Sequence, residues 1–215
     1  MLGNIPLFNG LSEIDLKLVG EMAIEKLVPK GTVVITEGEL GDSMYLVMSG
    51  RVKVFIGDED GREIILKMLG PGDVFGEMSL IDRQPRSASV STLEACTFRI
   101  LSHSSFEVCL ERAPRIAVGV MNALAKRLRD ADRKISTLAL MDVYGRVAHT
   151  LLELAVHTNG KLQVGQKLSQ QDIANMVGAS REMVNRILKD LSDRGYITVE
   201  SKSITIHNER LPVSL

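Results

Sequence analysis

Hydrophobic and polar positions alternate in short runs over much of the first half of the chain, and glycines stand between the runs. This pattern predicts short β-strands over residues 33–36, 44–48, 52–56, 63–68, 87–91 and 96–100. Before them, residues 13–27 carry a helical stripe with Ser12 as its N-cap, and residues 8–10 predict a turn. Many short strands with glycine at the corners are typical of a small antiparallel barrel or roll.

Residues 114–138 predict one long helix, and Pro114 suits its first turn. The a and d positions of its heptad pattern are all apolar: Ala117, Met121, Leu124, Leu128, Ala131, Ile135 and Leu138. Such a narrow stripe favours pairing with an identical helix, although an ordinary amphipathic core helix has a similar period. Because the segment lies between a predicted sheet and a predicted helical domain, we expect a dimerisation helix that joins them.

The last third of the chain predicts a small helical domain. Residues 137–141 are a candidate hinge, Asp142 is expected to cap a helix over residues 143–157, and residues 161–164 and 166–168 are expected to form a hairpin. Two further helices follow, with Ser169 and Ser180 as N-caps and Gly178 at the turn between them. Residues 196–199 and 203–207 then predict two strands. This order is typical of a winged helix-turn-helix.

The second of these two helices carries chemistry suited to DNA. Its apolar face holds Val184, Ile187, Leu188 and Leu191, and its outward face near the N-terminus holds Arg181, Glu182, Asn185 and Arg186. Arginine can donate to O6 and N7 of guanine, and glutamate can accept from N4 of cytosine. A solvated charged face would have a similar composition. Because the caps, the turn and the buried face are in register, the pattern favours a recognition helix.

Residues 75–88 interrupt the alternation of the strands. A strand is expected to run into Gly76 and then into about one turn of helix, where the backbone amides of Glu77, Met78 and Ser79 would bind an anion. Arg86 offers a planar fork for a phosphate, and Glu77 can accept from a ribose hydroxyl. An Arg–Glu ion pair that braces the roll would use the same residues, but the combination favours a nucleotide site.

The run Phe-Gly-Glu-Met-Ser-Leu, followed by Pro-Arg-Ser-Ala, resembles the phosphate-binding cassette of cyclic-nucleotide-binding domains. The whole chain resembles the cyclic-AMP receptor protein / fumarate-nitrate regulator superfamily of bacterial transcription regulators. The resemblance implies an α+β fold: a cyclic-nucleotide-binding-like antiparallel β-roll with flanking helices over residues 1–113, a dimerisation helix over 114–138 and a winged helix-turn-helix over 139–215.

The resemblance also implies roles for individual residues. The phosphate and ribose of a cyclic nucleotide, most simply cyclic AMP, would contact Gly76, Glu77, Met78, Ser79, Arg86 and Ser87. Arg181, Glu182 and Arg186 would read bases, with Asn185 beside them on the same face. Ser169, Gln171 and Ser180 would contact DNA phosphates. The implied partners are a second copy of the chain, double-stranded DNA with a two-fold symmetric site, and RNA polymerase.

The base-reading positions depart from the family pattern. Where the cyclic-AMP receptor has a Thr-Ser pair on its long helix, this chain has Ala131 and Asp132. A carboxylate can accept from both N1–H and N2–H of guanine, so Asp132 indicates cyclic GMP or cyclic di-GMP as an alternative ligand. A solvated helix residue flanked by Arg129 and Arg133 is the other interpretation. Control by no ligand at all also stays open.

Composition narrows the class of protein. The chain has 215 residues, enough for two modest domains, and a net charge of −1, so DNA contact must come from a local cluster. Cys96 and Cys109 are too few for a disulfide framework or an iron–sulfur set, which indicates a reducing cytoplasm. No apolar run approaches the roughly 18 residues needed to span a membrane.

Catalysis and metal binding are not expected. The 4 histidines are scattered without ligand spacing, which disfavours a haem or metal sensor. No second carboxylate or base accompanies Glu77, which disfavours an enzyme that hydrolyses a cyclic nucleotide. A nucleotide-binding regulatory module without DNA binding is the remaining alternative class, and the helix-turn-helix pattern argues against it.

Overall fold

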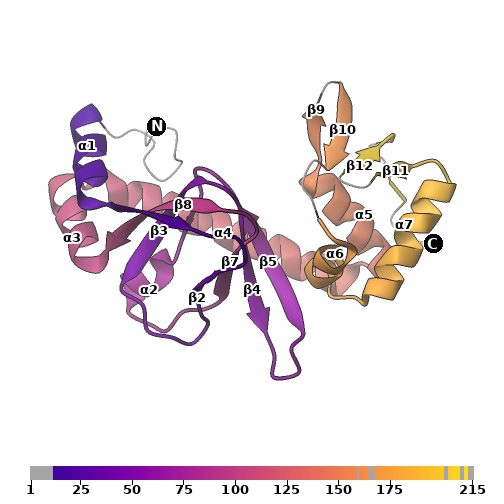
Figure 1. Cartoon of the computed structure of the whole chain (residues 1–215), viewed down its shortest axis with the longest axis horizontal. Helices are drawn as coiled ribbons and strands as arrows, with labels where there is room; N and C mark the ends of the chain where they lie inside the picture. The colour runs from indigo at the N-terminus through magenta and orange to yellow at the C-terminus, as the bar shows by residue number, and fades with distance from the viewer. Residues whose placement is uncertain (1–11, 159, 165–167, 201–202, 209–210, 213–215) are drawn as a thin grey trace. The chain divides into compact units, whose positions relative to one another are not determined.

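The computed structural model describes residues 12–158, 160–164, 168–200, 203–208 and 211–212. It divides into two compact units (Figure 1). The first comprises residues up to 130 apart from 62–64, and the second comprises residues 62–64 and 131–215. Helix α4 (Arg115–Leu140) is continuous and contributes residues to both units. The predicted α+β fold class, with a β-roll, a long helix and a helix-turn-helix in that order, is confirmed.

The first unit is a roll of two sheets, whose strand orders are β1-β8-β3-β6 and β2-β7-β4-β5 within the described residues. The strands are β1 (Ile24–Val28), β2 (Val33–Ile35), β3 (Ser43–Ser49), β4 (Val52–Gly57), β5 (Glu63–Leu69), β6 (Val74–Phe75), β7 (Ser89–Thr92) and β8 (Cys96–Ser102). In its core, the Tyr45 and Phe75 rings stack with centroids 4.9 Å apart, and Phe98 meets Phe75 edge-on at 5.5 Å. Alternating residues of the strands therefore build the core, as their period predicts.

The segment before the roll is partly strand rather than helix. Helix α1 (Glu13–Met22) begins with the predicted cap, a capping box between Ser12 and Asp15. The predicted helix over residues 13–27 is wrong beyond Met22, because β1 pairs with β8 in antiparallel register from Ile24 to Val28. A partner strand distant in the sequence decides this segment against its local helical period. The turn predicted over residues 8–10 lies outside the described residues.

Helices close one side of the roll. Helix α2 (Glu77–Asp82) follows β6, and α3 (His103–Arg112) has Ser102 as its N-cap, whose side chain accepts from the backbone N–H of Ser105. Helix α4 starts directly after Pro114 and buries Ile116, Gly119 and Val120 against α1, α3 and β3. No helix in the described part of the chain is both long enough and apolar enough to cross a bilayer.

Most of the heptad stripe of α4 lies on a different face from these buried residues, although Leu124 packs against the core of the roll. Met121, Leu128 and Ile135 are 59%, 66% and 65% exposed in the single chain. The helix thus has a short face that packs on the roll and a longer apolar stripe that the single chain leaves in solvent. Thr137 and the three residues after it form the last turn of α4, so the helix extends through most of the predicted hinge.

The second unit combines α5 (Val143–Leu154), α6 (Gln170–Val177) and α7 (Arg181–Asp193) with a sheet of order β11-β12-β10-β9. Its strands are β9 (Val156–Thr158), β10 (Lys161–Val164), β11 (Ile197–Val199) and β12 (Ile204–Ile206). The Asp142 cap is confirmed, but α5 ends at Leu154, and His157 lies on β9. β10 pairs with β9 and β12, which corrects the predicted hairpin with residues 166–168, of which only Leu168 is described.

A buried hydrogen bond joins α5 to α7. The Tyr144 hydroxyl donates to Asp190 Oδ2 at 2.8 Å, and Tyr144 is 2% exposed. Arg194 also lies 3.1 Å from Asp190, so a cation accompanies the carboxylate. Burial, followed by the bond to Asp190, raises the pKa of Tyr144 to about 12. The phenol is therefore held in its neutral, donating form, and it helps to set the angle between the two helices.

We expect Tyr144→Phe to lower the free energy of unfolding by roughly 1.5–3 kcal/mol at pH 7, because the bond to a charged acceptor is lost in a buried place. The folded pKa of about 12 exceeds the ordinary tyrosine pKa of 10.0. The stabilisation should therefore be complete below pH 10 and be lost as the pH rises through 12. Urea unfolding over this pH range measures it. The half-buried Tyr196→Phe is the control, and equal losses in both variants would contradict a stabilising Tyr144–Asp190 bond.

Candidate functional site

Gly76 is the point at which the chain leaves β6 and enters α2. Its backbone is left-handed, with φ of 79°, and it serves as the N-cap of α2. A Cβ at this position would lie 2.8 Å from Arg86 Nη1 and 3.1 Å from the Ser43 carbonyl oxygen. Both the conformation and the space therefore require glycine. The close approach brings the guanidinium of Arg86 against the backbone of the predicted cassette.

Arg86 is buried beside this turn, with 7% of its surface exposed. Its Nη1 donates to the Gly76 carbonyl at 2.6 Å and to Ser79 Oγ at 3.3 Å, and its Nη2 donates to the Ser43 carbonyl at 2.8 Å. A Cβ on Gly41 would meet the guanidinium at 2.1 Å, so Gly41 leaves room for it. Burial lowers the pKa of Arg86, while nearby Tyr45, Asp42 and Glu77 oppose that change. Arg86, the residue predicted to bind phosphate, thus lies at the cassette, where backbone carbonyls hold its guanidinium.

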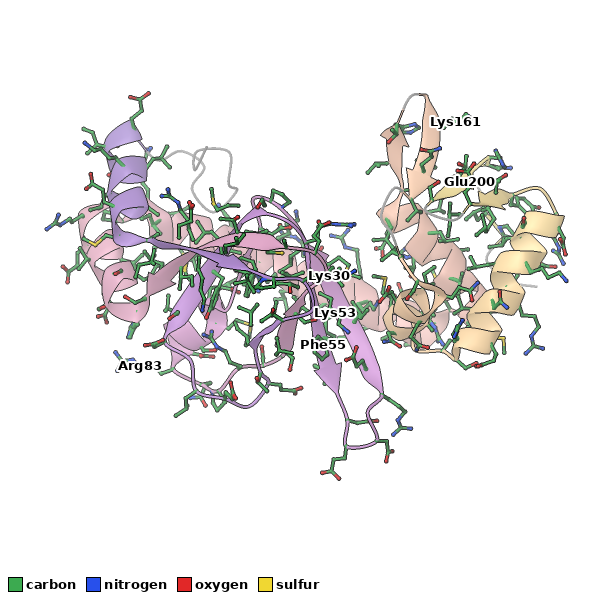
Figure 2. The ribbon with its side chains drawn as sticks, in the orientation of Figure 1. Lys30, Lys53, Phe55, Arg83, Lys161 and Glu200 are labelled. Carbon is green, nitrogen blue, oxygen red and sulfur yellow. The ribbon has the colours of Figure 1, made fainter. Side chains whose placement is uncertain are left out.

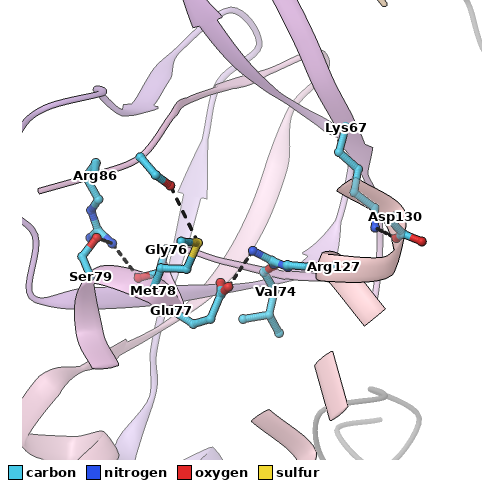
Figure 3. Close-up of polar contacts among 10 residues, drawn as sticks. Lys67, Val74, Gly76, Glu77, Met78, Ser79, Arg86, Arg127 and Asp130 are labelled. Carbon is cyan, nitrogen blue, oxygen red and sulfur yellow. Dashed lines mark hydrogen bonds and ion pairs between the residues drawn. The ribbon is translucent and has the colours of Figure 1, made fainter. Parts of the chain in front are cut away.

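Glu77 is the first residue of α2, and 4% of its side chain is exposed. Its Oε1 lies 2.5 Å from Arg127 Nη1 of α4, and Arg127 Nη2 donates to the Val74 carbonyl (Figure 3). This ion pair places a positive charge beside the carboxylate. It lacks the alignment of a hydrogen bond, and neither Glu77 oxygen has a hydrogen-bond partner within the described chain. A buried carboxylate with unused acceptor capacity is suited to a hydroxyl donor.

Arg127 is a site residue that the sequence did not predict. The signal that could have found it is its spacing from the buried face of α4. Val120 and Arg127 are seven residues apart, about two helical turns, so both point to the same side of the helix. An arginine that faces the roll is stabilised by a carboxylate on the roll, and Glu77 provides that carboxylate.

The other predicted ligand residues take different places. Ser79 is buried beside Arg86, whereas Met78 and Ser87 are exposed, with Ser87 Oγ donating to Met78 Sδ at 3.8 Å. Asp132 is exposed on α4, beyond the first unit, and makes no hydrogen bond or ion pair with the described residues. Its role as a base reader stays a prediction.

A hollow of about 540 Å³ lies next to the cassette but shares only Ser79 with the predicted ligand residues. Its other walls come from the loop before β3, the end of α2 and the start of α3: Leu40, Gly41, Asp42, Leu80, Arg83, Gln84 and His103. Arg83 extends outward from this part of the roll (Figure 2). The hollow therefore differs from the place where Glu77 and Arg86 converge on Gly76.

The helix-turn-helix has the predicted local structure throughout. Ser169 caps α6 in a capping box with Asp172, Gly178 ends α6 in the left-handed conformation with φ of 63°, and Ser180 caps α7. Ile173, Ala174, Val177 and the four predicted apolar residues of α7 are buried. The backbone of the motif is thus arranged by caps, turn and core together.

The outward face of α7 presents the predicted DNA-contacting residues. Arg181, Glu182 and Arg186 are exposed and make no hydrogen bond or ion pair within the described chain. Asn185 accepts from Gln170 Nε2 at 3.0 Å, so α6 orients it. Gln171 donates to Asn175 at 2.8 Å, and Ser169 and Ser180 use their hydroxyls as caps. The base-contacting and phosphate-contacting roles themselves stay predictions.

Comparison with known proteins finds two domain models in this chain: a cyclic nucleotide-binding domain over residues 25–113 and a Crp-like helix-turn-helix domain over residues 145–211. A CRP-like cAMP-activated global transcriptional regulator of Mycobacterium tuberculosis is 40% identical over 85% of this chain and 84% of its own length. The cyclic AMP receptor protein of Thermus thermophilus is 34% identical over 96% of this chain and 94% of its own length.

Among solved structures, the c-di-GMP responsive global regulator CLP of Xanthomonas campestris superposes with a TM-score of 0.80 at 29% identity, covering 92% of this chain and 100% of that chain. The chain thus spans most of the length of the relatives that it matches. The relatives in these comparisons are transcription regulators, so a DNA-binding regulator with a cyclic-nucleotide-binding domain is the class that the comparisons support.

The Glu77–Arg127 contact generates a stability prediction. Arg127→Met leaves Glu77 buried without its cation and should lower the free energy of unfolding by roughly 3 kcal/mol, the lower end for a buried pair because a third of the Arg127 side chain is exposed. Adding Glu77→Gln should restore much of that loss. Urea unfolding measures both variants. Lys126→Met, at an exposed neighbouring position, is the control, and a loss no larger than its loss would contradict the pairing.

Proposed function

Because this chain belongs to the CRP/FNR superfamily of transcription regulators, we propose that it is a homodimer whose affinity for DNA is controlled by a cyclic nucleotide bound in the β-roll. Cyclic AMP is the ligand that we favour. The observation that carries the proposal is the convergence of two buried charged residues, Glu77 and Arg86, on the left-handed turn at Gly76.

The chemistry of this convergence suits a cyclic nucleotide. A phosphate accepts charge-assisted hydrogen bonds that are about twice as strong as those to neutral acceptors, so it can draw Arg86 from the Gly76 and Ser43 carbonyls. The ribose hydroxyl can donate to Glu77, which has no hydrogen-bond partner within the described chain. Phosphate and ribose would thereby replace weak or missing partners with strong ones at both residues.

Two further observations bear on the identity of the nucleotide. Relatives from Mycobacterium tuberculosis and Thermus thermophilus are named for cyclic AMP, which supports that ligand here. The Xanthomonas campestris regulator is named for cyclic di-GMP, which keeps a guanine nucleotide as the second candidate, with Asp132 as its reader. A chain that binds DNA without any ligand is the third possibility.

The helix that we expect to bind DNA is α7. Its exposed Arg181, Glu182 and Arg186 are the side chains that we expect at base edges in the major groove, with Ser169, Gln171 and Ser180 near phosphates. In a two-fold symmetric dimer, two copies of α7 would meet half-sites about one turn of DNA apart. RNA polymerase is a further expected partner.

The exposed stripe of α4 supports the dimer. An apolar row at heptad spacing along a continuous helix is suited to a parallel pair of identical helices. Because the same helix also holds Arg127, a ligand bound to Glu77 would change a contact of the helix that joins the two copies. The ligand can shift the spacing of the two α7 helices only if it binds one arrangement more tightly than the other.

We expect Leu128→Glu to convert the dimer to a single chain, because it places like charges opposite each other at the centre of the apolar stripe. Sedimentation velocity with and without cyclic AMP measures the mass. Lys126→Glu, on the exposed flank of the same turn, should leave the dimer intact. A wild-type protein that sediments as a single chain, even with nucleotide and duplex present, would contradict the proposal.

The function itself is tested by selecting DNA duplexes from a random pool with and without cyclic AMP, followed by affinity measurements on the selected site. We expect a two-fold symmetric sequence and tighter binding when cyclic AMP is present. Arg181→Ala should cost roughly 1–3 kcal/mol of binding and relax the preference at one base pair.

Lys189→Ala is the matched control, since Lys189 lies on α7 about two turns beyond Arg181 and should change affinity little. Uniform weakening on all sequences by Arg181→Ala would make Arg181 a phosphate contact. Affinity for DNA that is independent of cyclic AMP, cyclic GMP and cyclic di-GMP would contradict control by a cyclic nucleotide.

A further inference from the structure

One side-chain hydrogen bond joins the two helices of the helix-turn-helix. Gln170, the first residue of α6, donates through Nε2 to Asn185 Oδ1 of α7 at 3.0 Å. The two helices pack against each other (Figure 1), and the part of the chain that the structure describes holds no other side-chain hydrogen bond between them. The bond therefore links the start of α6 to the outward face of α7, which also holds Arg181.

Gln170 and its neighbour Gln171 have different partners. Successive residues of an α-helix lie about 100° apart around its axis, because one turn takes 3.6 residues. Gln171 donates within α6, to Asn175 Oδ1 at 2.8 Å, whereas Gln170 reaches across to α7. Buried apolar residues on both helices already hold the motif together. The main consequence of the exposed Gln170–Asn185 bond is thus the direction in which the Asn185 amide points.

This bond uses a small part of the hydrogen-bonding capacity of Asn185. An asparagine amide has two N–H donors on its nitrogen and two lone pairs on its oxygen. Gln170 occupies one lone pair of Oδ1, and Asn185 makes no other side-chain hydrogen bond with the described residues. Asn185 is also exposed. It therefore keeps one acceptor site and two donors, next to each other, for a molecule that approaches α7.

Gln170 also determines which end of the Asn185 amide carries the oxygen. With Gln170 in place, half a turn of that amide would set Nδ2 against Nε2, two donor groups with no acceptor between them. An oriented amide presents its oxygen and its nitrogen in fixed places, whereas a free amide can turn either of them towards a ligand. The bond from Gln170 therefore makes the contact of Asn185 more selective.

The four bases differ in whether they match an oriented amide. In the major groove, adenine presents its N6 amino donor beside the N7 acceptor, so it can pair with the oxygen and the nitrogen of one amide at the same time. Guanine presents two acceptors, N7 and O6, and one of them would face the amide oxygen. Cytosine presents a donor alone, and thymine presents an acceptor alone. Adenine is therefore the base whose edge complements the amide.

Resting on the proposed function, in which α7 enters the major groove, we infer that Asn185 reads an adenine and that Gln170 is the positioning residue for this contact. Nδ2 of Asn185 donates to N7, and Oδ1 accepts from the N6 amino group while it keeps its bond from Gln170. Gln170 thereby supplies preference for adenine over guanine without touching a base. This role differs from the phosphate contact expected of Gln171, whose partner lies within α6.

The test uses the full chain, cyclic AMP and the two-fold symmetric duplex selected from the random pool, with each base pair replaced in turn. We expect an adenine in each half-site that the wild type prefers over guanine by about 5- to 150-fold, the range for a bidentate contact. Asn185→Ala should reduce this ratio to about one. At the same position, 7-deazaadenine, which lacks N7, and purine, which lacks the amino group, should weaken binding by the wild type but not by Asn185→Ala.

Variants of Gln170 separate positioning from a structural role. Gln170→Met should lower the adenine preference by about 2- to 10-fold, the net value of one hydrogen bond. Combined with Asn185→Ala, it should change the preference no further, because the two residues act as a unit. Gln170→Lys, which can donate to Oδ1 but cannot accept, should keep the preference. Asn175→Ala is the matched control, since it removes the bond from Gln171 within α6 and should alter affinity equally on all sequences.

The failure of the inference and the failure of the proposed function have different signatures. An adenine preference that Gln170→Met leaves unchanged, or that Gln170→Lys loses as fully as Gln170→Met, would overturn positioning by Gln170. A selected duplex in which no adenine responds to Asn185→Ala would overturn the inference, while its binding under cyclic AMP would still support the proposed function. A wild-type chain that selects no duplex sequence would contradict the proposed function, and the inference would fail with it.

Discussion

The contact between Glu77 and Arg127 is the interaction on which the arrangement of the first unit depends. It places a carboxylate in a buried position, where an isolated charge would be strongly unfavourable, and it neutralises that charge with a residue of the long helix. The cassette turn and α4 are therefore held together by electrostatics as well as by the apolar contacts of Ile116 and Val120. A ligand that donates to Glu77 acts on the same carboxylate that holds the helix.

Helix α4 has two faces with different surroundings. One face is short, packs on the roll and carries the charged residues that reach the cassette and β5. The other is the heptad stripe, of which the single chain leaves Met121, Leu128 and Ile135 more than half exposed. Both faces belong to one continuous helix. Within the second unit, Lys134 of the same helix donates to the Met176 carbonyl of α6 at 2.5 Å.

How well the sequence predicted each part depends on how local its determinants are. The helix-turn-helix was predicted residue by residue, because its caps at Ser169 and Ser180 and its turn at Gly178 act over three or four neighbouring positions. The segment from Ile24 to Leu27 was predicted as helix and is part of a strand, because pairing with β8, about seventy residues away, decides it. β10 was predicted as a strand, but its pairing was not, because it lies between β9, which directly precedes it, and β12, about forty residues further on.

The amino-acid sequence by itself determined the order of the elements, the glycine and arginine of the cassette, the buried and outward faces of α7 and the apolar stripe of α4. These follow from period, capping and chain geometry, which each stretch carries within itself. Only the tertiary structure decided which side of α4 meets the roll, and hence that Arg127 reaches Glu77 and Asp130 reaches Lys67. The physical reason is that the position of a charged side chain depends on the opposite charge that it contacts. Here each opposite charge comes from an element more than forty residues away.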